Sequence, residues 1–173
     1  MAAPALSVSL GSGHSSRWAK LHAMSSLDWS IKAFESAVEM FVKDLRAMEE
    51  DALLASAGHA RAPIDFAFEV GLVNRHIGNR IKGEPSTLPN EGWIRAPSEF
   101  RTKAAVIDHL LASRDELLSG ARAMSDGDKL VPTSEGETPV YDLVYFAATH
   151  TMYHDGQLNY IQAMSGDLAV HWS

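Results

Sequence analysis

Hydrophobic residues recur at alternating spacings of three and four along four segments of the chain, the period of an amphipathic helix. The first segment starts at Ser25 and Asp28, which have the spacing of a capping box. One continuous helix is predicted from there until Gly58 ends it. Its buried face comprises Leu27, Ile31, Phe34, Val38, Phe41, Leu45, Met48 and Ala52.

The second segment begins at Pro63, which suits the first turn of a helix, and ends at Gly83. Its apolar stripe comprises Phe66, Val70, Val73, Ile77 and Ile81. Residues 83–97 hold three prolines and two glycines and are predicted to form a loop. Ser98 is then expected to cap a third helix, with a stripe of Phe100, Ala104, Ile107, Leu111, Leu118 and Ala121.

The fourth segment is introduced by Thr138 and Pro139, a typical pair of cap and first-turn residues, and predicts a helix over 139–164. Residues 125–137 are predicted to be a loop. Alternating strand patterns are nearly absent. Four amphipathic helices of this length favour an all-α fold, a four-helix bundle.

Composition narrows the range of functions. The 173 residues are enough for one domain, which we place at 25–173, after a flexible N-terminal extension over 1–24. The net charge of -7 argues against a nucleic-acid partner. No apolar run is long enough to span a membrane. The chain has no cysteine, which excludes thiolate ligands and fits a cytoplasmic location.

Two histidines occupy the predicted inward face of the fourth helix. His150 and His154 are four residues apart, in line with Leu143, Ala147 and Ile161. Side chains at this spacing project from one face and can bind a single ion. Alternatively, they are core histidines bonded to buried polar groups. Two desolvated imidazoles side by side favour a metal site.

A further ligand must come from another helix, and the second offers Glu69 and His76. Glu69 lies among apolar residues, where an unpaired carboxylate is costly. A solvated carboxylate, or one paired with Arg75 or Arg80, is the alternative. We take Glu69 as the third metal ligand and keep His76 as the other candidate. Ordinary roles suffice for the remaining histidines, which are His14, His22, His59, His109 and His171.

The stretch HTMYHDGQLNYIQAM, residues 150–164, resembles the last-helix motif of the DinB-like (DNA-damage-inducible) superfamily. That motif is His-x-x-x-His followed by Gly-Gln and an apolar tail. Pro63 and the Gly83–Glu84 exit are similar to the family too. The resemblance covers about 24–166. It implies a bundle with a crossed connection and a divalent metal held by three side chains. In that family all three are histidines, and Glu69 stands where the first is usual.

Relatives of this kind include thiol-dependent S-transferases, a mycothiol-dependent maleylpyruvate isomerase and metal-dependent hydrolases. The resemblance therefore implies a metal-dependent enzyme acting on a small molecule, with a low-molecular-weight thiol as one candidate partner. A non-catalytic metal-binding bundle and a metal-free interaction module remain alternatives. Zinc, nickel, manganese and iron all suit two histidines and a carboxylate. A homodimer is a further expectation.

If the chain is an enzyme, further polar residues near these ligands are candidates for a part in its function. Tyr153, Asp155 and Gln157 flank the histidines and are expected to orient them or the substrate. Alternatively, Tyr153 is a packed aromatic residue, Asp155 is a solvated charge and Gln157 is a polar residue bonded to the backbone. Trp93 and Arg95 in the long loop are candidates to close over the site, or else anchor the loop at the surface.

Overall fold

Four long helices form the body of the protein, as the hydrophobic pattern predicted. The computed structural model describes residues 24–172 except 57, 87, 90–92 and 135, so the extension expected over 1–24 lies almost wholly outside the described residues. None of the described helices is long and apolar enough to cross a membrane. The long helices are α2 (Ser26–Ala47), α4 (Pro63–Lys82), α5 (Lys103–Arg122) and α6 (Val140–Met164).

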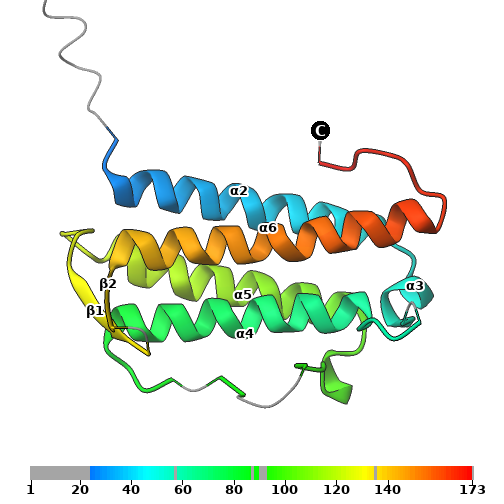
Figure 1. The fold of residues 1–173 in the computed structure, drawn as a ribbon, viewed down its shortest axis with the longest axis horizontal. Helices are drawn as coiled ribbons and strands as arrows, with labels where there is room; N and C mark the ends of the chain where they lie inside the picture. The colour runs from blue at the N-terminus through cyan, green and yellow to red at the C-terminus, as the bar shows by residue number, and fades with distance from the viewer. Residues whose placement is uncertain (1–23, 57, 87, 90–92, 135, 173) are drawn as a thin grey trace, which may run out of the picture.

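The helices are joined by a crossed connection, which the family resemblance implied. Helix α2 packs mainly along α6, and α4 mainly along α5. Figure 1 shows α4 and α5 running in the same direction, so the chain between them returns along the length of the bundle. Helices α2 and α6 share the opposite direction. This arrangement sets α6 beside α4 as well as α2. The centre of α6, at His150 and His154, thereby lies against Glu69 in the first half of α4.

Two helix boundaries follow directly from local chemistry. The Ser25 hydroxyl accepts a hydrogen bond from the Asp28 amide at 3.1 Å, and the Asp28 carboxylate accepts one from the Ser25 amide at 3.3 Å. The predicted capping box is therefore present. Helix α4 starts with Pro63 and ends at Gly83, whose φ of 75° is a left-handed conformation that glycine adopts without strain.

The first predicted helix is interrupted, which the periodicity did not reveal. Met48 is extended, with ψ of 140°, and a short helix α3 (Glu50–Leu54) follows it. Both Met48 and Leu53 are nevertheless buried. The apolar spacing continues across the break because both segments pack on the same core, so it predicted one helix where there are two.

The start of the third helix was also predicted incorrectly. Ser98 begins a 3-10 turn, η1 (Ser98–Phe100), and Thr102 caps α5 by accepting a hydrogen bond from the Ala105 amide at 3.2 Å. Thr102 is the better cap because its backbone is extended directly before the helix. The buried face is rotated accordingly. Ala104 is exposed, whereas Val106, Leu110 and Leu117 are fully buried.

The segment predicted as the last loop contains a β-hairpin. Strand β1 (Leu130–Thr133) pairs antiparallel with β2 (Gly136–Pro139), and Gly136 has a φ of 123°. Thr138 pairs with Val131 within this hairpin, so it does not cap α6 as expected. Pro139 occupies the cap position of α6 and makes no side-chain cap bond. The strands are too short and polar for their alternation to be read from the sequence.

Candidate metal centre

Glu69 on α4 meets His150 and His154 on α6. The Glu69 Oε1 atom lies 3.7 Å from His150 Nε2 and 3.6 Å from His154 Nε2. One donor atom from each of the three side chains lies within 4.8 Å of the others. The exposed fraction of the side chain is 18% for Glu69, 16% for His150 and 2% for His154. The set is thus mostly enclosed, with His150 and Glu69 partly accessible to solvent.

These separations fit ligands around one ion better than direct hydrogen bonds. An N–H···O hydrogen bond spans about 2.7 to 3.2 Å, which is shorter than either histidine–Glu69 distance. Ligands about 2.1 Å from a tetrahedral ion lie about 3.4 Å from one another. The donor set, two imidazole nitrogens and a carboxylate oxygen, also suits several divalent ions. The residues present therefore fit a metal ion.

The charge state of Glu69 suits a ligand role. Burial acts to raise the pKa of Glu69, but interactions with His150, His154 and Arg61 outweigh it and hold the pKa well below its ordinary range. The carboxylate is consequently ionised at neutral pH, as a metal-binding carboxylate must be.

Arg61 is the residue of this site that sequence reasoning missed. Its guanidinium forms an ion pair with Glu69 Oε2 and stacks on the rings of Phe66, at 5.1 Å, and Trp93, at 5.8 Å. Glu69 was considered as a partner of Arg75 or Arg80, and that alternative is wrong. Arg61 precedes α4 and has no helical spacing to Glu69, so no sequence signal links the two.

Gln157 fixes the orientation of His154. Its Oε1 atom lies 2.8 Å from His154 Nδ1, and its Nε2 atom donates to the Tyr153 hydroxyl at 3.0 Å. Because an amide oxygen only accepts, His154 Nδ1 must carry the proton. That tautomer leaves Nε2 directed toward Glu69 as a ligand atom. For His150, Nδ1 is buried with no hydrogen-bond partner among the residues that the structure describes.

His76, the other candidate ligand, lies outside this set. Its Nδ1 atom is 2.9 Å from the Ser86 hydroxyl, and its Nε2 atom accepts a hydrogen bond from Arg80 at 2.8 Å. Burial, followed by the charge of Arg80, lowers the pKa of His76. Both ring nitrogens are therefore engaged at the far end of α4.

Two polar residues that were not predicted to be buried lie in the interior, Asp155 and His109. Asp155 was expected either to orient the ligands or to be solvated, and it does neither. It faces Asp44 of α2, and burial together with that neighbouring acid raises the pKa of Asp155 to about 7. The predicted apolar stripe of the third helix did not include His109, yet only 5% of its surface is exposed. Both errors arise because the helices that cover these side chains are distant in sequence.

The long loop contributes to the surroundings of the centre. Trp93 is exposed but rests over Arg61, whose guanidinium also donates to the Ile94 carbonyl at 3.4 Å. The loop is thereby tied to the side chain that pairs with Glu69. Arg95 is exposed, which agrees with the alternative that it lies in the loop at the surface.

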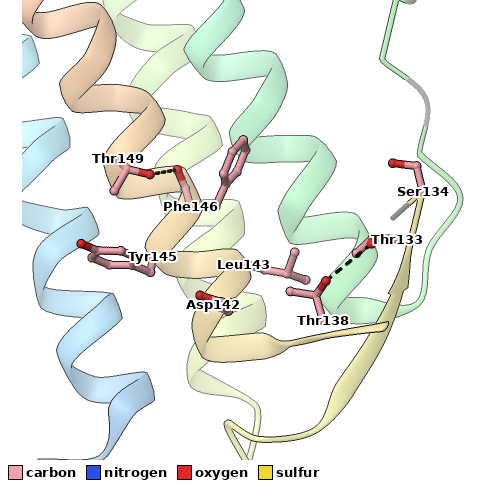
Figure 2. Close-up of a pocket in the computed structure, with 8 residues that line it drawn as sticks. All are labelled: Thr133, Ser134, Thr138, Asp142, Leu143, Tyr145, Phe146 and Thr149. Carbon is pink, nitrogen blue, oxygen red and sulfur yellow. Dashed lines mark hydrogen bonds between the residues drawn. The ribbon is translucent and has the colours of Figure 1, made fainter. Parts of the chain in front are cut away.

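Two hollows lie along α6. One, of about 580 Å³, shares Phe66 and Gln157 with the surroundings of His154. The other, of about 400 Å³, lies between the hairpin and the first turns of α6 and is lined largely by hydroxyl-bearing side chains (Figure 2). Its nearest link to the centre is Phe146, whose ring stacks against His150 at 6.0 Å. Neither hollow is lined by Glu69, His150 or His154 themselves.

The fold and this site define a class: an all-α bundle with a crossed connection and a two-histidine, one-carboxylate cluster between α4 and α6. A sequence profile of the DinB superfamily matches residues 70–158. The chain belongs to the DinB superfamily. The matched segment contains His150 and His154 and begins one residue after Glu69. No curated protein matches the chain.

Proposed function

We propose that the protein binds one divalent metal ion through Glu69, His150 and His154 and acts as a metal-dependent enzyme on a small molecule, of the thiol S-transferase or hydrolase type. The observation that carries this proposal is the spacing of the three donor atoms. They are too far apart for hydrogen bonds and at the separation of ligands around an ion.

The side chains around the cluster support a catalytic role over a purely structural one. A divalent ion with three protein ligands supplies Lewis acidity and lowers the pKa of a bound water or thiol. Gln157 holds His154 in the ligating tautomer, and Arg61 balances the charge of Glu69. The partial exposure of His150 and Glu69 leaves room for a small molecule to approach.

One specific observation favours a metal-free alternative. The ion pair with Arg61 already neutralises Glu69, so the cluster can be a polar link between α4 and α6 without any ion. Metal analysis separates the two functions. Screens with low-molecular-weight thiols and small esters then distinguish an enzyme from a non-catalytic metal-binding bundle, since turnover must require both the ion and the two histidines.

Protein purified without a histidine tag and equilibrated with zinc or nickel is expected to hold about one ion per chain. Replacing His150 and His154 together by alanine should reduce this to about one tenth or less, because two of three ligands are lost. His76→Ala is the matched control, a histidine of the same bundle that lies outside the cluster, and should retain the ion. Elemental analysis after dialysis gives the stoichiometry. Wild-type metal content in the double variant would refute the ligand assignment.

The role of Glu69 is tested by a pair of substitutions. Glu69→Ala should weaken zinc binding by about 100-fold or more, since it removes a charged ligand, whereas Glu69→His should retain binding because imidazole is also a zinc ligand. Competition with a chromogenic chelator at one pH measures the affinities. If Glu69→Ala retained zinc binding and His76→Ala lost it, the third ligand would be His76 and the assignment of Glu69 would be wrong.

A further inference from the structure

The larger hollow on α6 is an apolar pocket next to the candidate metal centre. It has a volume of about 580 Å³, and its walls include Phe66, Tyr153, Gly156, Gln157, Tyr160 and Met164. Three of these side chains are aromatic, and none of the described residues that line the pocket is charged. A pocket of this size and character accommodates an apolar group of a small ligand.

The pocket shares two walls with the surroundings of His154. The Phe66 ring stacks on the imidazole of His154, with the ring centres 5.4 Å apart and the planes at 22°. Gln157, a wall residue, bonds to Nδ1 of the same imidazole. A molecule whose apolar part fills the pocket therefore lies beside two side chains that contact the His154 imidazole.

Gly156 is an exposed residue that lines the pocket. It lies in the interior of α6, where glycine is unfavourable, and its backbone does not have the positive φ that would require glycine. Apart from its own stretch of helix, none of the residues that the structure describes has a heavy atom within 4 Å of a Cβ atom built on Gly156. A larger side chain at this position would therefore extend into the pocket space.

We propose that this pocket binds an uncharged aromatic ring of the substrate, while the reacting group of the same molecule lies at Glu69, His150 and His154. The proposal rests on the proposed function and specifies its substrate class. The three aromatic side chains of the wall favour a ring over an extended aliphatic chain, because aromatic groups stack on one another. The lack of charged wall residues disfavours a charged group at this end.

The test uses two probes with the same metal-binding group, benzohydroxamate and acetohydroxamate, and zinc-loaded protein. Calorimetric titration of the wild-type protein should show benzohydroxamate binding about tenfold more tightly or better, because only this probe has a ring to bury. In Gly156→Leu the new side chain fills the pocket, so the preference should disappear while acetohydroxamate binds as before. Ala112→Leu, which adds a leucine at an exposed position on α5, is the control and should keep the preference.

Folding and metal binding are checked separately. Leucine favours helix more than glycine does, so Gly156→Leu should melt no lower than the wild type. If the protein holds no zinc, 4-methylphenol added to the metal-free protein tests the pocket alone. Its NMR shifts should centre on the Tyr153, Gly156 and Tyr160 signals and vanish in Gly156→Leu. No preference between the hydroxamates, or an unchanged preference in Gly156→Leu, overturns the pocket. For metal-free protein, the absence of NMR shifts on addition of 4-methylphenol also overturns the proposal that the pocket binds an aromatic ring.

Discussion

Replacing Gly71 by alanine is expected to lower the free energy of unfolding by about 2 to 3 kcal/mol, the upper part of the range for overpacked cores. A Cβ atom at Gly71 would lie 2.2 Å from both Cδ2 and Nε2 of His109. That imidazole cannot move aside easily. It is stacked against Phe68 at 4.9 Å and tilted against Phe100 at 4.8 Å, and Arg75 contacts its Nδ1 atom at 2.7 Å.

Gly156→Ala is the matched control for this prediction. Both glycines are interior to long helices, so alanine gains about 1 kcal/mol of helix propensity at either one. Of these two glycines, Gly71 alone has a described neighbour within contact distance of the new methyl group. Urea unfolding should show Gly156→Ala as stable as the wild type or more so. The double variant Gly71→Ala with His109→Ala should be more stable than the sum of its single changes. Additive single changes would show that no clash with His109 exists.

Acidification from pH 7.5 to 5 is expected to cost about 2 kcal/mol of stability through His109 alone. Burial, followed by the charge of Arg75, lowers the pKa of His109 to about 4 from the ordinary value of 6.5. The folded state therefore binds fewer protons at this residue than the unfolded state does between these two values. The contribution of His109 to the free energy of unfolding is fully present above about pH 6.5 and is lost as the pH falls toward 4.

His109→Phe removes this titration and keeps a ring between Phe68 and Phe100. Arg75 retains its contact with Glu116 in the variant, at 3.1 Å. The measurement is the free energy of unfolding in urea at both pH values, for both proteins. The difference between wild type and variant should shift by about 2 kcal/mol in favour of the variant at pH 5. A constant difference at the two pH values would mean that His109 titrates normally, and its burial would then not exclude the charged form.

Part of the candidate site could be predicted from local sequence patterns. His150 and His154 lie in line with buried residues of α6, and a spacing of four places them on one side of a helix whatever surrounds it. Glu69 was found because a carboxylate among Phe66, Phe68 and Val70 needs a partner. The partner that it has, Arg61, was not predictable, because the linker before α4 must fold back before the two meet.

Features that depend on neighbours along the chain were predictable from local patterns: the four amphipathic helices, the capping box at Ser25, the ends of α4 at Pro63 and Gly83, and the pair of histidines on α6. Features that depend on contacts between distant elements became visible only in the packed bundle. Asp155 is buried because α6 packs on α2, and His109 is buried because α5 packs on α4. Glu69 meets the α6 histidines because α4 lies beside α6. Local periodicity reports which face of a helix is buried, and only packing decides which side chains from other helices meet that face.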